Sequence, residues 1–596
     1  MKKVLSCFLV LTMLLSLCSW GLAEAYKEYT ATAQGYGSEV SVTLTLDGNR
    51  IYAVEVKGDS ETQGIGSNAI DALPQAMVDS NSVVVDTFSG ATFTSKAILE
   101  AAAAALAQAG LTNDDLEKAE PTETAVVHED MTCDILVLGG GGTGLVAAVS
   151  AIENGADPAR VVVVEKTGVF GGTSATAGAV LTGPLTRFMK SQGYTYSEEQ
   201  WVDDWMANVA HYVEIVGVDP GYPERARVEA YLAGICPALD WLEDLGFVKW
   251  TYYRSMPGTD FVIPEAIVQE DGSQLFVGGY TITDPMVEYL KAAGADLRLN
   301  TAGTELVVED GKVVGAVVTD ANGSYTIRAD TGVVLATGGY SRDEELLSQY
   351  SPAYVNWISF DTASVADTGD GIKMARDIGA AMYENGAIIS VGTSSPNRVA
   401  GNFANFMSVA QRLLVNSHAE RFVNEGADYY EVSLRIDEQP DNGTAWAVLA
   451  DNTEGVDVLD AQVDGETVVS ADSLEALAEA MHVSPEALAT TVARYNEDCA
   501  AGNDTVMGKM LTPEMAVQGN KYYAFRVGVC MAGTIGGVKT DADFHVLDTE
   551  GKIIEGLWAG GCVSNRSIMG YTYMHGAGFG YAIVSGRTIG ERIMGK

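Results

Sequence analysis

The pattern of apolar and polar positions between residues 133 and 179 predicts a βαβ unit. Residues 134–138 form a short apolar run suited to a buried parallel strand, and residues 145–154 have a helix-like pattern. A second run of β-branched residues, 161–164, ends at Glu165. Two parallel strands joined by a helix indicate an α/β fold.

The turn between the first strand and the helix, residues 139–144, reads GGGGTG and satisfies the pattern G-x-G-x-x-G. Its glycines let the backbone turn tightly and approach a pyrophosphate, which then lies at the positive end of the following helix. Glu165, roughly 20 residues further on, is placed to accept hydrogen bonds from ribose hydroxyls. The pattern therefore predicts dinucleotide binding, with a turn that merely closes a βα unit as the alternative.

A separate small α+β domain is predicted at residues 26–112. Residues 39–46 alternate between polar and apolar, residues 47–48 are a turn signal, and residues 50–56 form a second short strand, so a β-hairpin is expected. Residues 82–86 are expected to add another strand, and an alanine-rich helix follows.

Residues 113–335 contain a predicted linker, a helical stretch and several predicted strands. Residues 113–131 are acidic and aperiodic and are interpreted as a linker. From residue 180 to about 273 the pattern is mostly helical, and its tryptophans are assigned to the core. Residues 307–319 predict two strands with a turn at Gly311, and residues 333–335 predict a return to the main sheet.

The N-terminus predicts export. Two lysines precede an apolar run at residues 4–17, and an A-x-A site occupies residues 23–25, so residues 1–25 are interpreted as a Sec-type signal peptide. The mature protein is then expected to be secreted, at the cell surface or periplasmic. An uncleaved membrane anchor is the alternative, because the apolar character persists for about 20 residues, enough to span a bilayer.

The composition removes several classes of partner. The formal net charge of −44 argues against nucleic acids and anionic membrane surfaces, which a like-charged protein repels. None of the seven cysteines lies in a C-x-x-C motif, so the chain offers no iron–sulfur or zinc spacing and no c-type haem attachment. No metal site is expected.

Four later segments decide which dinucleotide is expected: GGTS at 171–174, ATGG at 336–339, TGDG at 368–371 and GLWAGG at 556–561. In this order they resemble the fumarate reductase/succinate dehydrogenase flavoprotein family, from roughly residue 133 to the C-terminus. The resemblance implies a Rossmann-like FAD-binding domain made of residues 132–385 and 526–596. It also implies an α+β cap domain inserted at residues 386–525.

FAD is the cofactor that this resemblance implies. Members that bind FAD covalently use a His near the GG loop, and none lies between His128 and His211, so non-covalent binding is expected. The residues expected to contact FAD are Gly139, Gly141, Gly142, Thr143, Gly144, Glu165, Lys166, Gly172, Thr173, Ser174, Ala177, Gly178, Ala336, Thr337, Gly338, Asp370, Gly560 and Gly561.

The small domain carries a second resemblance. Residues 86–92 read DTFSGAT and precede the alanine-rich helix, as in the FMN-binding domain of sodium-pumping and Rnf-type electron-transfer complexes. In that family the last Thr of S/T-G-A-T holds FMN through a phosphoester, which implies covalent FMN on Thr92. Gly90 would let the backbone close on the phosphate beside the helix N-terminus. A helix-capping Ser/Thr cluster is the alternative.

The family resemblance also locates a substrate site, and the family's charged groups are missing from it. Counting from the marker RFVNE at 421–425 puts the proton-donating Arg of fumarate reductases at Tyr429. The second substrate Arg falls on Tyr573, or on Thr572 when counted from the other side, and a His position falls on Ala532. Burying a dianion without paired cations costs several kcal/mol per charge. Fumarate and succinate are therefore not expected as substrates, and urocanate is disfavoured for the same reason.

The segment at 569–573, MGYTY, resembles the C-terminal segment of flavin-dependent 3-ketosteroid dehydrogenases, in which a Tyr and a backbone amide polarise the ketone. The resemblance again indicates Tyr573, with an amide near Ala577. Tyr429 is expected to protonate the substrate carbon, and His575 to assist proton delivery. Packing is the alternative for the tyrosines, and packing or flavin contact for His575.

Together these features predict an exported two-flavin oxidoreductase that reduces an activated C=C bond of a small enone or enoate. Hydride would leave FAD N5, and electrons from a membrane-bound donor would arrive through FMN. The alternatives are a urocanate- or fumarate-type reductase with a remodelled site, a 3-ketosteroid-type dehydrogenase, and an electron-transfer flavoprotein subunit.

Overall fold

The computed structural model describes most of the chain. The described residues are 26–35, 39–58, 61, 66–85, 91–117, 129–217, 221–256, 259–265, 267–268, 274–275, 278–352, 355, 363–394, 409–440, 445–571, 573–574 and 576–596. The chain divides into two compact units, Met1–Val127 and His128–Lys596, and each is described by itself. The expected signal peptide lies outside the described residues.

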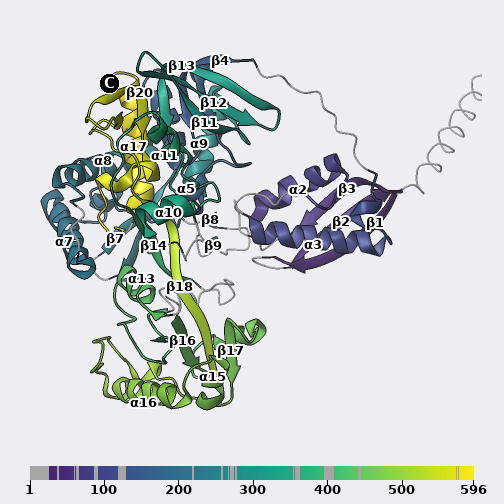
Figure 1. Cartoon of the computed structure of the whole chain (residues 1–596), viewed down its shortest axis with the longest axis vertical. Helices are drawn as coiled ribbons and strands as arrows, with labels where there is room; N and C mark the ends of the chain where they lie inside the picture. Colours follow the sequence, from purple (N-terminus) through teal and green to yellow (C-terminus); the bar gives the residue numbers. More distant parts are fainter. Residues whose placement is uncertain are drawn as a thin grey trace, which may run out of the picture. The chain divides into compact units, whose positions relative to one another are not determined.

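The small unit is a three-stranded antiparallel sheet packed against two helices (Figure 1). Its strands are β1 (Tyr26–Gln34), β2 (Glu39–Asp47) and β3 (Arg50–Lys57), paired in that order. Helices α2 (Gly66–Ser80) and α3 (Thr92–Gln108) contact the strands. Alternate residues of β2 are fully buried, so one face of the sheet supplies the core. The predicted hairpin and the alanine-rich helix are confirmed.

The strand expected at residues 82–86 is wrong for 82–85, which form no strand; residue 86 lies outside the described part. The preceding Asn81 has a φ of +48°. Its side chain accepts from the Ile51 N–H at 2.6 Å and donates to the Glu117 carbonyl at 2.6 Å. Because such side-chain bonds compete with a sheet ladder, the segment turns instead of pairing.

The small domain extends further than its predicted end at residue 112. Residues Asn113–Asp115 form a short 3₁₀ helix, and Leu116 is buried in the core of the small unit. The Glu117 N–H donates to the carbonyl of Asn49 at 3.0 Å. The predicted linker 113–131 is therefore too long at its start, and residues 118–128 lie outside the described part.

The core of the large unit is a mixed sheet in the order β10-β5-β4-β13-β12-β11, with β20 beside β13. The strands are β4 (Met131–Leu138), β5 (Val161–Val164), β10 (Asp296–Arg298), β11 (Ala302–Glu309), β12 (Lys312–Asp320), β13 (Gly323–Leu335), β19 (His545–Leu547) and β20 (Ile553–Ala559). The first half of β13 pairs antiparallel with β12, and its second half pairs parallel with β4 and β20. The predicted βαβ unit, the two strands joined at Gly311 and the return to the main sheet are all confirmed.

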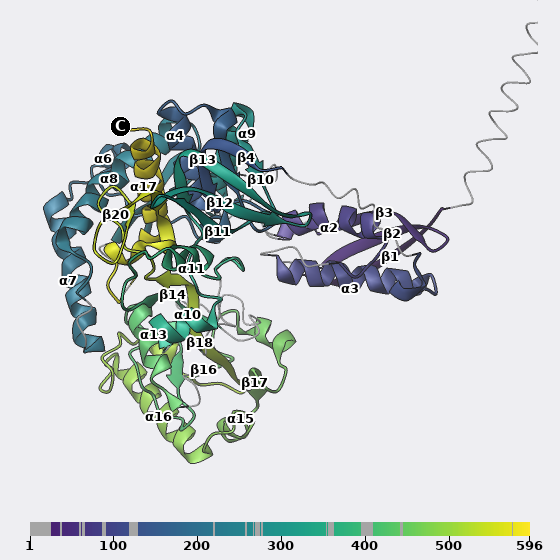
Figure 2. The same ribbon diagram turned by 45° about the horizontal axis from the view of Figure 1, so that its top comes forward.

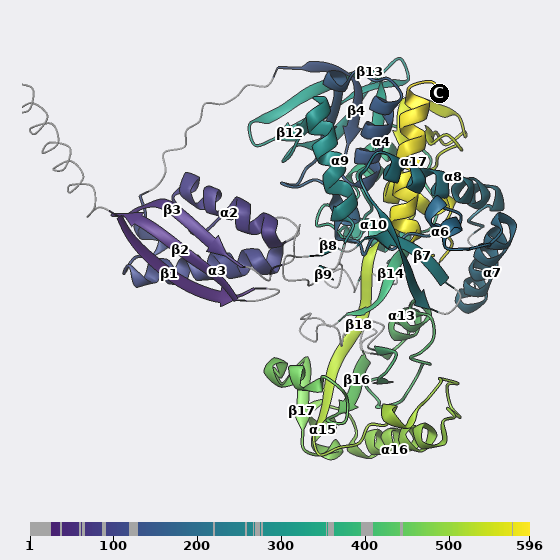
Figure 3. The same ribbon diagram turned by 180° about the vertical axis from the view of Figure 1, so that it is seen from behind.

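Helix α4 (Gly142–Glu153) packs against the C-terminal helix α17 (Ala577–Ile593), and the two lie side by side in Figures 2 and 3. Glycines allow the close crossing. A Cβ on Gly586 would lie 2.6 Å from the carbonyl oxygen of Thr143, and one on Gly590 would lie 2.5 Å from the Cβ of Ser150. The crossing therefore fixes α4, whose first residues border the site described below.

Helices α6 (Arg187–Ser191), α7 (Glu198–Val216) and α8 (Arg225–Asp244) confirm the helical pattern expected after residue 180. The expectation is wrong beyond residue 250, where β6 (Trp250–Met256) and β7 (Thr259–Pro264) form a hairpin. Aromatic and β-branched residues are dense in both strands, and they favour a pleated sheet over a helix.

The cap contains a five-stranded sheet. Its longest strand, β18 (Tyr522–Ile535), starts in the outer cap and ends in the FAD-binding part (Figures 1 and 2). The sheet order is β14-β18-β16-β15, and β17 also pairs with β18. The other strands are β14 (Ala387–Ser394), β15 (Leu413–Val415), β16 (Ala445–Ala450) and β17 (Val468–Ala471). Because β18 continues unbroken past residue 525, no break in secondary structure marks the domain boundary predicted there.

The RFVNE marker builds a buried ion cluster in the cap. Arg421 donates twice to Glu425, at 2.8 Å each, and also pairs with Asp504 at 2.7 Å. Lys509 pairs with Glu425 at 3.2 Å. Two buried cations and two buried anions thus compensate one another, which is what makes their burial tolerable.

The remaining elements are α5 (Gly172–Thr176), α9 (Tyr280–Ala293), α10 (Glu344–Tyr350), α11 (Asp370–Asp377), α13 (Tyr429–Asp437), α15 (Leu474–Ala480), α16 (Pro485–Ala501), β8 (Ile267–Val268), β9 (Gln274–Leu275) and the 3₁₀ helices η2 (Pro158–Arg160), η5 (Val456–Gln462), η6 (Pro513–Met515), η7 (Gly561–Val563) and η8 (Asn565–Ser567). In the part of the chain that the structure describes, no helix is both long and apolar enough to cross a bilayer.

The α4–α17 crossing predicts the effect of Gly590→Val. The added side chain must push the helices apart, because a Cβ alone would meet Ser150 at 2.5 Å and the Ala147 carbonyl at 2.7 Å. We expect a loss of about 1–3 kcal/mol in the free energy of unfolding, typical of overpacking. Urea denaturation measures it, and an unchanged midpoint contradicts the packing described here.

Candidate active site

A cavity of about 490 Å³ lies where the parallel strands end. Its walls include Leu138 and Val164, the last residues of β4 and β5, and Ala336, which directly follows β13. Ligands of open α/β sheets bind at this carboxyl edge. The cavity is therefore in the place that the βαβ pattern indicates for a dinucleotide.

All but two of the residues expected to contact FAD line this cavity. They are Gly139, Gly141, Gly142, Thr143, Glu165, Lys166, Gly172, Thr173, Ser174, Ala177, Gly178, Ala336, Thr337, Gly338, Asp370 and Gly560. The exceptions, Gly144 and Gly561, do not line it. A Cβ on Gly144 would lie 2.0 Å from the Gly139 carbonyl oxygen, and one on Gly561 would lie 2.3 Å from Thr143 Oγ1, so both allow close packing behind the cavity wall.

The start of α4 is suited to an anion. Its N-cap is Gly141, which supplies no side-chain cap, and its first turn holds no acidic residue. The first N–H groups of a helix lack partners within the helix and carry a partial positive charge. A pyrophosphate at this point would satisfy them.

Glu165 is buried beside the glycine turn. Its Oε2 accepts from the Gly140 N–H at 2.9 Å, and its Oε1 accepts from the N–H and the hydroxyl of Thr167, each at 2.8 Å. Three of the roughly four acceptor positions of the carboxylate are thus used. The remaining one can accept a ribose hydroxyl, as the sequence pattern predicts.

An ion pair lines the same cavity near Glu165. Lys166 follows β5 and forms an ion pair with Asp370, at 2.7 Å, at the start of α11. Asp370 also accepts from the Thr368 hydroxyl at 2.8 Å. Since Lys166 and Asp370 line the cavity as a neutral pair, they add polarity there without adding net charge.

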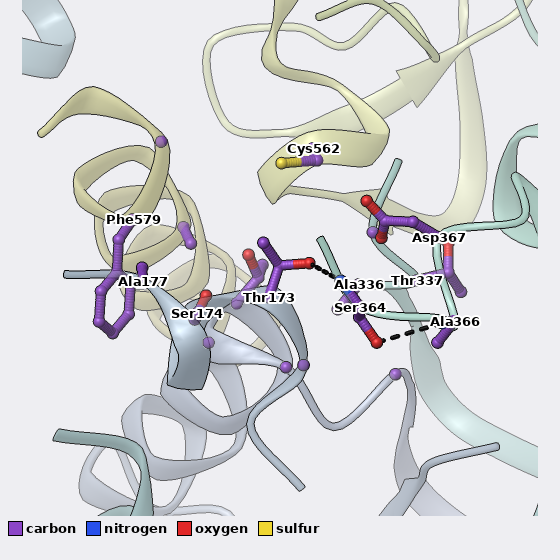
Figure 4. Close-up of a pocket in the computed structure, with 18 of the residues that line it drawn as sticks. Thr173, Ser174, Ala177, Ala336, Thr337, Ser364, Ala366, Asp367, Cys562 and Phe579 are labelled. Atoms are coloured by element: carbon purple, nitrogen blue, oxygen red, sulfur yellow. Dashed lines mark hydrogen bonds between the residues drawn. The ribbon is translucent and has the colours of Figure 1, made fainter. Parts of the chain in front are cut away.

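Hydrogen bonds also fix the loop on the opposite wall (Figure 4). The Ser364 N–H donates to the Thr173 hydroxyl at 2.9 Å, and the Ala366 N–H donates to the Ser364 hydroxyl at 3.1 Å. Thr337 also lines the cavity; its Oγ1 is buried, has no hydrogen-bond partner in the described structure and lies against Gly371 of α11. The helix start and Glu165 make the cavity fit FAD.

Several lining residues were not predicted, among them Asp367, Cys562 and Phe579 (Figure 4). Asp367 accepts from the Gly339 N–H at 3.1 Å and stands directly before the TGDG segment, which is the signal that could have found it. Burial raises the pKa of the Cys562 thiol to about 12, so it is a neutral wall residue. No sequence pattern marks Phe579, which faces the cavity only because of how α17 packs.

Tyr573 lines the cavity together with Ile389, Ala532 and Gly578. Burial raises the pKa of its phenol to about 12, although backbone hydrogen bonds from Gly578 and Gly576 partly oppose this shift. The amide expected near Ala577 is already engaged, since the Ala577 N–H donates to the Met574 carbonyl at 2.9 Å. The N–H groups of its neighbours Gly576 and Gly578 bond to the Tyr573 phenol, so an amide near Ala577 that polarises the substrate stays a prediction.

The other two expected catalytic side chains are not described. Tyr429 is the first residue of α13, but its side chain lies outside the described part, and so does all of His575. The neighbouring Asp428 caps α13 and accepts from the hydroxyl of Tyr212, on α7, at 2.6 Å. This bond ties the start of α13 to the helical part of the large unit.

In the small unit, Thr92 is the first residue of α3, and its side chain lies outside the described part. The N-cap, Ala91, supplies no side-chain cap, and the first turn holds no acidic residue. The start of α3 is thus suited to a phosphate, as FMN requires. In the described ranges, no group of three or more His, Cys, Asp or Glu residues is placed to hold a metal ion.

The Glu165 bonds predict the effect of Glu165→Gln. The NH₂ of the amide cannot accept, so one of the backbone donors at Gly140 or Thr167 loses its acceptor. We expect FAD affinity to fall by about tenfold or more, measured by titrating the apoprotein with FAD and following flavin fluorescence. The exposed Glu198→Gln makes the same charge change elsewhere and should leave the affinity unchanged; equal affinities in the two variants would exclude a role for Glu165.

Family comparisons agree with this geometry. The family model described as "FAD binding domain" matches residues 134–579, and the model described as "FMN-binding domain" matches residues 35–107. The chain is 29% identical to the urocanate reductase of Eggerthella lenta over 558 residues, which covers 90% of this chain and 87% of that protein.

Two solved structures resemble the large unit. One is the open conformation of a flavocytochrome c3 fumarate reductase, with a TM-score of 0.62 and 27% identity over 78% of this chain and 79% of that one. The other is the 3-ketosteroid Δ1-dehydrogenase of Sterolibacterium denitrificans, with a TM-score of 0.65 and 22% identity over 78% and 99% of the two chains, a likeness of fold. This chain belongs to the FAD binding domain family and carries an FMN-binding domain ahead of its FAD-binding part.

Proposed function

We propose that this protein reduces an activated C=C bond of a small enone or enoate, with electrons that enter through its FMN-binding domain. The enzyme is an FAD-dependent oxidoreductase that acts on CH–CH groups. The observation that carries the proposal is the place of Tyr573, a buried phenol on the wall of the FAD cavity. The family resemblance implies that this position holds the substrate's carbonyl or carboxylate.

Bound FAD would supply the hydride that saturates the double bond. Tyr573 donates a hydrogen bond to the substrate carbonyl and draws electron density away from the double bond. The backbone N–H groups of Gly576 and Gly578 bond to the phenol oxygen, which polarises its O–H and makes it a better donor. Tyr429 gives the proton to the α-carbon, and His575 assists its delivery.

The cavity wall supports a substrate other than a dicarboxylate. The residues that line it around Tyr573, namely Ile389, Ala532, Cys562 and Gly578, are all neutral. A dianion held among them would lack the paired cations that its burial requires. The match to urocanate reductase extends over 90% of this chain, and a singly charged substrate is compatible with both observations.

The small domain gives electrons a route that needs no soluble nicotinamide. FMN would be linked to Thr92 by a phosphoester and would receive electrons from a membrane-bound donor outside the cytoplasm. This part of the proposal includes export by the signal at residues 1–25. N-terminal sequencing of the exported protein tests it, since cleavage there leaves Tyr26 first.

A 3-ketosteroid-type dehydrogenase is the second candidate. The pairing of Tyr573 with glycine amides favours it, because such a pair polarises a ketone equally well in the oxidative direction. Anaerobic mixing separates the two directions. Bleaching of the flavin by a saturated ketone supports the dehydrogenase, and reoxidation of reduced flavin by an enone supports the reductase.

The proposed tether predicts the effect of Thr92→Ala. Without the hydroxyl no phosphoester can form, so the intact mass should lose one FMN while the FAD content stays the same. Reductase activity with reduced viologen as donor should fall at least about a hundredfold, if FAD accepts electrons only through the small domain. Thr43→Ala, at a half-buried position of β2, is the control; covalent flavin persisting in Thr92→Ala would place the tether elsewhere.

The role of Tyr573 predicts the effect of Tyr573→Phe. Losing one donor to a developing oxyanion typically costs about 10²–10³ in kcat, and FAD should still bind. Since the pKa of Tyr573 is about 12, the phenol stays protonated, and the wild-type rate should show no tyrosine titration between about pH 6 and 9. Steady-state kinetics over that range measure both effects. A variant with full activity would remove Tyr573 from the reaction.

A further inference from the structure

A second cavity, of about 390 Å³, lies next to Tyr571. It is walled by the last residues of α7 and α10 and by α13, and it is also lined by Asn385 and Tyr430. Tyr430 packs with Tyr212 and Tyr573, and Tyr573 lines the FAD cavity. Tyr430 of the second cavity thus packs with Tyr573 of the FAD cavity, and the two cavities are neighbours.

A buried arginine stands behind this second cavity. Arg566 is 0% exposed; its Nη1 donates to the Gly570 carbonyl at 2.5 Å, and its Nη2 donates to Asn385 Oδ1 at 2.7 Å. Its Nε has no hydrogen-bond partner, and within the described residues the guanidinium forms no ion pair with a carboxylate. The ring of Tyr571 lies 5.1 Å from its Cζ atom.

Arg566 differs in this respect from two buried cations of the cap. Those two, Arg421 and Lys509, are matched by Glu425 and Asp504. Arg566 has only neutral acceptors, and burial lowers the pKa of its guanidinium, which nevertheless stays protonated. Because the interior screens charge weakly, its positive potential extends into the neighbouring cavity.

Two residues connect Arg566 with the surface of the second cavity. Asn385 and Tyr571 both touch Arg566 and both line the cavity. Arg566 occupies the carbonyl oxygen of Asn385, so the amide presents its N–H donors to a ligand, which suits an anion. Of the two acids on the cavity wall, Glu438 is paired with Arg435 at 2.9 Å, and Asp437 is engaged in an interaction of its own.

We propose that the second cavity binds a carboxylate group of the substrate remote from the reacting double bond, and that Arg566 is the residue that makes this group preferred. The inference deepens the proposed function and rests on it. The substrate class is then an enone with a single distal carboxylate, held by its carbonyl at Tyr573 in the FAD cavity and by its anionic end in the neighbouring second cavity. Arg566 is a positioning residue, since it acts through Asn385 and Tyr571.

Two matched probes test the inference: benzylideneacetone with a para-carboxylate, and the methyl ester of the same compound. For the wild-type holoenzyme we expect a Kd and a KM at least about tenfold lower for the acid than for the ester, from flavin fluorescence titration and steady-state kinetics. In Arg566→Gln the preference should vanish through a higher KM for the acid, with kcat for the ester unchanged. Arg566→Lys should keep most of the preference.

Stability separates an electrostatic role from a structural one. Since Arg566→Gln removes an unpaired buried charge, its thermal midpoint should not fall, whereas a merely structural arginine would lose stability with its bonds. Asn385→Asp is the second variant, because a carboxylate beside Arg566 should neutralise it, abolish the preference for the acid and raise the midpoint. Lys249→Gln changes the net charge equally at an exposed position that lines neither cavity, and it should change neither property.

The outcomes distinguish the two proposals. Equal affinity of the wild type for acid and ester, or a preference that survives both Arg566→Gln and Asn385→Asp, overturns the carboxylate subsite. If the acid binds with the expected dependence on Arg566 but neither probe is reduced, the subsite stands and the proposed reductase activity fails.

Discussion

The cofactor site depends on the close approach of three backbone segments, the glycine turn, the start of α4 and the residues after β13. A Cβ on Gly139 would lie 2.3 Å from the Ala336 carbonyl oxygen, and one on Gly144 would lie 2.0 Å from the Gly139 carbonyl oxygen. Only glycine permits both contacts, because every other residue carries a Cβ. The contacts bring β4, α4 and the end of β13 together, so that the unpaired N–H groups of α4 point at the cavity. The rest of the FAD site is arranged around that point.

The sequence predicts much of this, because its signals are local. Glycines that need a special φ, an acidic residue at a strand end and alternating apolar residues all act over a few positions, and β4, α4, β5 and the small hairpin follow from them. The failures are where distant groups decide the local structure. Residues 82–85 turn because Asn81 bonds to Ile51 and Glu117. Phe579 faces the cavity because of how two helices cross, which no short pattern records.

In the candidate site, too, sequence patterns predict some residues and miss those that depend on long-range contacts. The family resemblance led to Tyr573, and the structure puts it on the cavity wall. Arg566 was not predicted, because an arginine in a sequence carries no sign that it will be buried, and its neighbours in sequence are ordinary. Only the fold shows that its side chain is fully enclosed and bonded to Asn385, 181 positions away. The prediction that the substrate site lacks cations therefore holds for the described residues around Tyr573. It does not hold for the region of the second cavity, where Arg566 is buried.

The long strand β18 has a consequence for motion. It pairs with β16 and β17 in the outer cap, and further along it pairs with β14 and carries Ala532, which borders the FAD cavity. The ladder between β14 and β18 is irregular at two places, near Ile388 and Ser390. A bend of β18 at those irregular pairs would shift Ala532 relative to the rest of the FAD cavity wall. The orientation of the outer cap and the shape of the cavity are thus coupled through one strand.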